Sequence, residues 1–275
     1  MITTSNTKPR GGKPFQIGPD TARETILLVG SCRVNAHINY FDRYNRTAAD
    51  PVRVFFVDPH DAHWNDDGQQ QDLESALLAM ESNPNYLNAI KSATVYLHEH
   101  YGNFGMWNAA QDAQKNIYQF GMSPRLDICI PNFHDRFVLF QERMNLDPNL
   151  QISFRVHGGM TPRIFGQMRH DGLDALEKFY SVCALSSFPE MAAHVRENWT
   201  KTRFFWTGNH VSAAFTLYLF RQLNDRFLHL PLDDEFWQGA ATEDLFAKPC
   251  TPVTQYDVDA YGLTWPDTPI ASLKP

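Results

Sequence analysis

Four short runs of apolar residues in the first half of the chain predict buried β-strands. Each run is too short for a helix and stops at a glycine, a proline or a polar residue, as strands buried on both faces of a sheet do. The runs cover residues 26–29, 52–57, 93–97 and 126–130. A further segment, residues 151–159, is either a fifth strand or an extended loop.

Apolar residues at spacings of three and four predict helices between these strands and throughout the second half. One follows the first strand, and others cover residues 72–80, 173–184 and 189–200. A last stripe runs from Val211 to Leu223, with Asn209 as its N-cap and His210 in its first turn. The pattern indicates an α/β fold with a short central parallel sheet and a mainly helical C-terminal half.

Length and composition favour one domain. Residues 1–20 are rich in Thr, Lys, Gly and Pro, do not resemble a signal peptide, and are expected to form a flexible tail. Residues 21–275 are expected to form a single domain. No stretch approaches the roughly 20 apolar residues of a membrane span.

Charge and cysteine content exclude several functional classes. A net charge of −7 argues against nucleic acid as a partner, because neutralising phosphates needs a basic face. The four cysteines lie far apart, which favours reduced thiols in a cytoplasmic protein. His98-Glu99-His100 and the pair His60 and His63 are read as ordinary polar residues, so no metal site is predicted.

The Gly30-Ser31-Cys32-Arg33 segment lies where the first strand should turn into a helix. A helix start offers free backbone N–H groups and a positive dipole end, which stabilise a thiolate. Cys32 is therefore either a reactive thiol or a small buried hydrophobe that closes the turn. His210 is the candidate partner for a reactive thiol at Cys32, because the helix dipole would disfavour protonation of its imidazole. Asn209 could stabilise an oxyanion.

A basic segment in the middle of the chain is a second candidate. Arg155 and His157 precede Gly158-Gly159. They indicate either recognition of an anionic group such as phosphate or a surface loop with incidental charge.

Three motifs in a fixed order resemble the WcbI family of bacterial capsular polysaccharide biosynthesis enzymes. They are Gly30-Ser31-Cys32-Arg33, Phe154-Arg155-Val156-His157 and the Phe205–His210 segment that precedes the last helix. Pro252-Val253 and Gly262-Leu263 also match positions of that family. The family usually has Gly-Asn-Cys-Gln at the first motif and Asn-His-Pro where this chain has Asn209-His210-Val211.

The resemblance implies an enzyme that binds coenzyme A or acetyl-CoA and acetylates a hydroxyl of a saccharide. Its partners would be an acyl donor, a saccharide acceptor and other polysaccharide-synthesis proteins. The implied catalytic residues are Cys32, His210 and Asn209. The implied cofactor-binding residues are Gly30, Ser31, Arg33, Arg155, His157 and Ser212.

Two rival functions remain open. The Gly-Ser-Cys corner also resembles the nucleophile turn of SGNH-type esterases, which predicts an SGNH-like subdomain and a hydrolase. The late Asp-x-x-His of those esterases is missing here. The other rival is a non-catalytic module that binds coenzyme A or a nucleotide and partners a glycosyltransferase.

Overall fold

The structure is a computed structural model, and it describes only part of the chain. The described residues are 2, 14–30, 32–57, 82–100, 117–131, 176–177, 179–204, 211–242, 244, 253–254, 258, 261–264 and 270–271. The predicted elements at 72–80 and 151–159 lie outside them.

The chain divides into two compact units, and each is built from three separate stretches of the sequence. The first comprises Met1–Asn132, Ser186–Phe188 and Thr216–Glu243; the second comprises Phe133–Leu185, Pro189–Phe215 and Asp244–Pro275. The assignment of residues 21–275 to a single domain stays a prediction.

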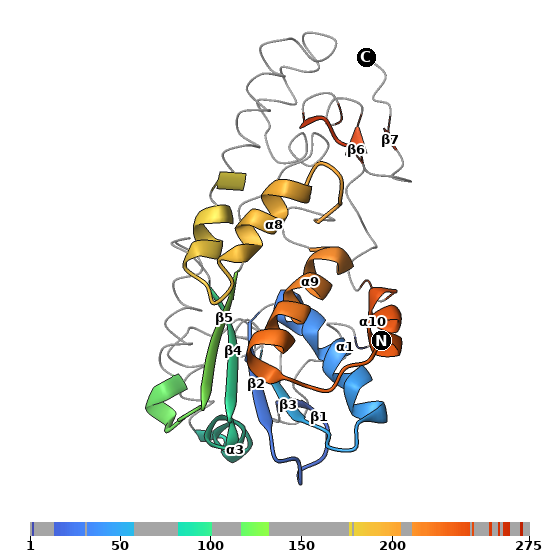
Figure 1. Ribbon diagram of the computed structural model, residues 1–275. Helices are drawn as coiled ribbons and strands as arrows, with labels where there is room; N and C mark the ends of the chain where they lie inside the picture. The colour runs from blue at the N-terminus through green and yellow to red at the C-terminus, as the bar shows by residue number, and fades with distance from the viewer. Residues whose placement is uncertain are drawn as a thin grey trace. The chain divides into compact units, whose positions relative to one another are not determined.

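A five-stranded mixed sheet forms the centre of the first unit (Figure 1). Its order is β1-β3-β2-β4-β5, with β2 to β5 parallel and β1 antiparallel to β3. The four predicted strands are confirmed. Residues 15–17, which were expected in the flexible tail, instead form the edge strand β1. The strands are β1 (Phe15–Ile17), β2 (Thr25–Val29), β3 (Arg53–Val57), β4 (Val95–His100) and β5 (Leu126–Pro131).

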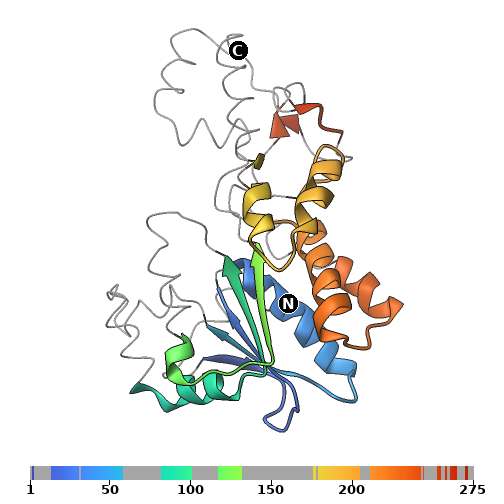
Figure 2. The same cartoon turned by 60° about the vertical axis from the view of Figure 1, so that its left-hand side comes forward.

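Helices cover both faces of this sheet (Figure 2). One face is covered by α1 (Cys32–Thr47) and α9 (Ala213–Leu223), and α10 (Asp234–Ala241) packs against these two helices. The other packs against α3 (Pro84–Ser92) and the 3₁₀-helix η4 (Ile117–Phe120). Because both faces are covered, every residue of β2 is buried, as its continuous apolar sequence predicts. The α/β fold expected from the sequence is therefore confirmed.

Aromatic side chains join α1 to α9. Phe220 of α9 is fully buried, and its ring lies 4.8 Å from the ring of Tyr40 and 6.0 Å from that of His37. The hydroxyls of Tyr40 and Thr216 are 2.9 Å apart and share a hydrogen bond. His37 is buried, and its Nδ1 has no hydrogen-bond partner among the described residues.

Acid is expected to destabilise the first unit through His37. Burial lowers the pKa of His37 from its ordinary value of 6.5 to about 4. Between these values the unfolded chain binds a proton that the folded protein does not. Stability should therefore fall by roughly 3 kcal/mol as the pH drops from about 6.5 to about 4. His37→Phe keeps a ring beside Phe220 and should give a shallower acid slope in urea unfolding. Equal slopes for the two proteins would contradict this assignment.

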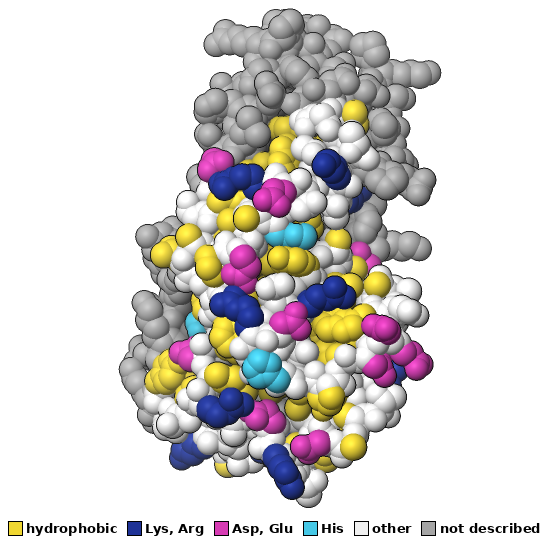
Figure 3. Space-filling model, in the orientation of Figure 1, with side chains coloured by type: hydrophobic (Ala, Val, Ile, Leu, Met, Phe, Trp, Pro, Cys, Tyr) yellow, Lys and Arg dark blue, Asp and Glu magenta, His cyan; other side chains and the backbone are white. Residues whose placement is uncertain are grey.

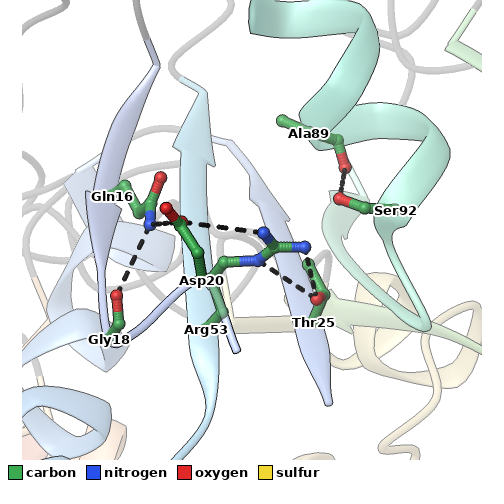
Figure 4. A network of polar contacts seen from close by, with 7 residues as sticks. All are labelled: Gln16, Gly18, Asp20, Thr25, Arg53, Ala89 and Ser92. Carbon is green, nitrogen blue, oxygen red and sulfur yellow. Dashed lines mark hydrogen bonds and ion pairs between the residues drawn. The ribbon is translucent and has the colours of Figure 1, made fainter. Parts of the chain in front are cut away.

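A polar network ties β1, β2 and β3 together at the amino end of β2 (Figure 4). The guanidinium of Arg53 donates from Nη2 and Nε to Thr25 Oγ1, at 3.1 and 3.3 Å. Its Nη1 lies 3.7 Å from the Asp20 carboxylate, which also accepts from Gln16 Nε2 at 2.8 Å. These contacts fix the edge strand β1. They lie at the amino ends of β2 and β3, away from the carboxyl ends of these strands.

The described part of the second unit is mostly helical. It includes helical residues 179–184, α8 (Glu190–Asn198) and the first turn of α9. A small parallel pair, β6 (Val253–Thr254) and β7 (Ile270–Ala271), completes it. The predicted helices at 173–184 and 189–200 are confirmed where they are described. No helix in the described ranges is long and apolar enough to cross a bilayer.

The last predicted helix begins later than the sequence indicates. α9 starts at Ala213, and Val211 and Ser212 are not helical. The N–H of Ser212 donates to the carbonyl of Phe204 at 2.8 Å, which holds Ser212 outside the helix. Asn209 and His210 lie outside the described residues, so the N-cap and the neutral imidazole predicted for them stay predictions.

Candidate functional site

The strand order places a topological switch point at the carboxyl ends of β2 and β4. The chain leaves β2 through α1 to reach β3 on one side, and β4 then pairs with β2 on the other side. The two connections cover opposite faces of the sheet (Figure 2). Ligands of open α/β sheets bind at such topological switch points. Gly30, directly after β2, and residues 98–100, at the end of β4, lie at this point.

Position 30 requires a glycine because there is no room for a side chain. Its backbone does not adopt the left-handed conformation that would require a glycine. A Cβ atom there would come within 2.5 Å of Val34 Cγ2 and 2.9 Å of Glu99 Cγ. The missing side chain thus lets α1 begin directly against the ends of β2 and β4. The predicted strand–turn–helix arrangement is confirmed, although the reason for the glycine differs from the expected one.

Cys32 is the first residue of α1, a helix of 16 residues. The first four N–H groups of an α-helix have no partner within the helix. The first turn of α1 contains no acidic residue, and Arg33 is its second residue. This helix start is therefore suited to an anionic or thiolate group. Of the predicted cofactor-binding residues in this segment, Ser31 lies outside the described residues.

Glu99 is a buried carboxyl side chain that the site prediction omitted. It is 1% exposed, and it lies against Gly30 on the face of the sheet that α1 covers. Val95, Leu97 and Glu99 alternate along β4, so Glu99 occupies a core-facing position. Side chains of this type are almost never fully buried unless they are paired. Along the predicted strand at residues 93–97, Val95 and Leu97 point to the core. Continuing this alternation by two residues would have placed Glu99 on the same face.

Asn35 is a second buried polar side chain near this corner. It lies one turn after Cys32 on α1, on the same side of the helix as Cys32. The side chain is 1% exposed, and neither Oδ1 nor Nδ2 has a hydrogen-bond partner among the described residues. Leaving both amide atoms unpaired costs stability. A ligand with both a donor and an acceptor would remove that cost.

His98, Glu99 and His100 lie inside β4, although the sequence placed them beyond the strand. They pair in register with Cys129, Ile130 and Pro131 of β5. No group of three or more metal-ligating side chains is found within the described ranges. His60 and His63 lie outside those ranges.

Of the remaining predicted site residues, the structure describes only Ser212. Ser212 is buried, and its hydroxyl donates to the Arg203 carbonyl at 2.6 Å, so it helps to hold the start of α9. Its role in binding a cofactor stays a prediction. Arg155, His157, Asn209 and His210 lie outside the described residues, and their roles also stay predictions.

Charged side chains are mixed on the visible face of the protein. Lys and Arg side chains are interspersed with Asp and Glu (Figure 3). Acidic side chains gather at α10, where Asp233, Asp234 and Glu235 are exposed. The described residues on this face form no extended basic surface of the kind that nucleic-acid binding requires.

Comparisons with known proteins show that the fold is similar to that of a solved structure. No family profile and no curated protein sequence matches the chain. The structure is similar to that of WcbI, described as a novel polysaccharide biosynthesis enzyme, in its native form without a disulfide bond between coenzyme A and one of its cysteines. The match covers 88% of this chain and 80% of that chain, with a TM-score of 0.52 and 12% sequence identity. At this identity, the likeness concerns the fold alone.

Proposed function

We propose that the protein is a coenzyme A-dependent acyltransferase that acetylates a hydroxyl of a saccharide or of a saccharide precursor. The position of Cys32 carries the proposal. This residue begins α1 beside the switch point of the sheet. The fold is shared with a polysaccharide biosynthesis enzyme whose description names coenzyme A and a cysteine together. The Gly-x-Cys motif of that family falls at this same corner.

The groups at the start of α1 fit the chemistry of coenzyme A. Its phosphates carry negative charge, which suits a helix start without acidic residues and with Arg33 in the first turn. Its pantetheine arm contains amide groups that both donate and accept hydrogen bonds. Asn35 has a buried, unpaired donor and a buried, unpaired acceptor one turn from Cys32. We propose that Arg155 and His157 also contribute to phosphate binding, as the resemblance implies.

We propose His210 as the general base of the transfer. It takes the proton of the acceptor hydroxyl, whose oxygen then attacks the acyl carbon of the thioester. The carbon–sulfur bond breaks, and the donor sulfur leaves as a thiolate that takes the proton back from His210. Asn209 or backbone N–H groups at the start of α1 stabilise the oxyanion. Cys32 either carries the acyl group on its sulfur between two transfers or lines the thiol end of the donor site.

The test is an assay with acetyl-CoA and a panel of saccharides. Release of free thiol together with acetylated saccharide, both detected by mass spectrometry, is the expected result. Hydrolysis of p-nitrophenyl acetate without coenzyme A, and no transfer, would favour an SGNH-type hydrolase. Binding of coenzyme A without either turnover would favour a non-catalytic partner of a glycosyltransferase. Either outcome would overturn the proposal.

A further inference from the structure

A second group of reactive side chains lies on the other face of the sheet, the face that α3 and η4 cover. Tyr96 pairs in register with Asp127, and His98 pairs with Cys129. Residues two apart on a strand point to the same face, so all four side chains share it. Tyr96 belongs to the core beneath α3 and η4, which identifies the face. We call Tyr96, His98, Tyr118, Asp127 and Cys129 the β4–β5 cluster.

Hydrogen bonds fix the orientation of His98. Its Nε2 lies 3.0 Å from Asp127 Oδ1, and the hydroxyl of Tyr118 donates to Asp127 Oδ2. The His98 ring stacks on Tyr96, with ring centroids 4.7 Å apart. Both carboxylate oxygens of Asp127 are thus occupied. Since Nε2 faces a carboxylate, that nitrogen carries a proton.

His98 is positively charged near neutral pH. Burial by itself favours the neutral ring, but the hydrogen bonds to Asp127 and Cys129 outweigh it and raise the pKa of His98 to about 9. The hydrogen bond from His98 lowers the pKa of the Asp127 carboxyl. Burial raises the pKa of Tyr96 and of Tyr118, so both phenols stay neutral. The charged pair beside Cys129 is therefore an imidazolium and a carboxylate, and α3 contributes Tyr86, Ala89 and Ile90 to the neighbouring core.

Cys129 is held in place next to this imidazolium. Its N–H donates to Ser187 Oγ at 2.9 Å, and its carbonyl accepts from the Ser187 N–H at 2.7 Å. The side chain is only partly buried, whereas Cys183 is fully buried and burial raises the pKa of its thiol. The Tyr96 hydroxyl adds a buried polar group without a hydrogen-bond partner among the described residues. The cluster thus combines a thiol on a backbone that Ser187 holds, an imidazolium, and a buried phenol hydroxyl without a partner among the described residues.

We propose that Cys129 is a nucleophilic thiolate, stabilised by the His98 imidazolium, that exchanges with low-molecular-weight disulfides. The thiolate attacks one sulfur of the disulfide and forms a new sulfur–sulfur bond. The old bond breaks, and its second sulfur leaves as a thiolate that takes a proton from water. One disulfide is consumed and one is formed, so no further oxidant is required. This modification site is separate from Cys32 and does not depend on the acyltransferase activity.

Oxidised glutathione is the probe for this site. The folded protein is incubated with it near pH 7, and the modified cysteines are mapped by peptide mass spectrometry. The expected result is a glutathione adduct on Cys129, with Cys183 unmodified as the internal control. His98→Gln, checked for folding by circular dichroism, should slow formation of the Cys129 adduct at least tenfold. A variant that reacts as fast as the wild type would overturn the proposal.

A second measurement uses only the wild-type protein, so it does not depend on the folding of a variant. The rate of Cys129 alkylation by iodoacetamide is followed from about pH 6 to about pH 8. A thiolate held by His98 should react at a nearly constant rate over this range. An ordinary thiol, with a pKa of about 8.5, would react roughly tenfold faster for each pH unit. That ordinary profile would overturn the proposal.

Discussion

Replacing Phe220 with alanine is expected to lower the free energy of unfolding by about 3–5 kcal/mol. Phe220 is fully buried, and its ring contacts residues of both α1 and α10. The substitution would leave a cavity at the centre of these contacts, because the surrounding rings collapse only partly into the space. The rings in contact are those of His37, Tyr40, Phe41, Phe236 and Trp237.

Urea unfolding measures this loss, and Leu185→Ala is the matched control. Leu185 is 68% exposed, so removing its side chain should change the free energy of unfolding by no more than about 0.5 kcal/mol. A loss below about 1 kcal/mol for Phe220→Ala would show that the α1–α9–α10 packing is not as described.

The second large effect concerns catalysis. His210→Ala is expected to lower kcat/KM for acetyl transfer roughly 10²–10⁴-fold, because the acceptor hydroxyl would lose its general base. Cys32→Ser separates the two mechanisms of the proposed function. It should prevent formation of an acyl-enzyme if Cys32 carries the acyl group, and largely spare turnover if Cys32 only lines the donor site.

Steady-state rates and intact-protein mass spectra measure these effects, with Cys129→Ser as the control for cysteine removal. Cys129 lies on the other face of the sheet, so its loss should leave the transfer rate unchanged. Full activity of folded His210→Ala would refute its role as the base.

The fold of the first unit was largely predictable because its strands are buried on both faces. The apolar run before Gly30 predicted β2 to within one residue, and the stripe after it predicted that a helix follows, which is α1. The extent of β4 was underestimated, since His98 and His100 have the composition of a loop. Pairing with Cys129 and Pro131 keeps these residues in the sheet, and that contact is not visible in the local sequence.

The start of α9 shows the same limit. The apolar stripe continues back to Val211, so periodicity alone extends the helix too far. Hydrogen bonds from Ser212 to Arg203 and Phe204 instead hold Ser212 outside the helix.

The candidate site was predictable in position but not in composition. Parallel strands bring their carboxyl ends together, so the corner at Cys32 could be placed from the sequence. Glu99 and Asn35 were missed, because a single polar residue in an apolar pattern resembles an ordinary surface position. The β4–β5 cluster was missed for a different reason: His98, Asp127 and Cys129 meet only through the register of two strands.

Hydrogen–deuterium exchange with and without coenzyme A tests the central claim most directly. If coenzyme A binds at the start of α1, millimolar ligand should slow amide exchange in peptides that span residues 28–36. The N–H groups there would become hydrogen-bonded to the ligand. Unchanged exchange in folded protein, or slower exchange confined to other segments, would contradict the claim.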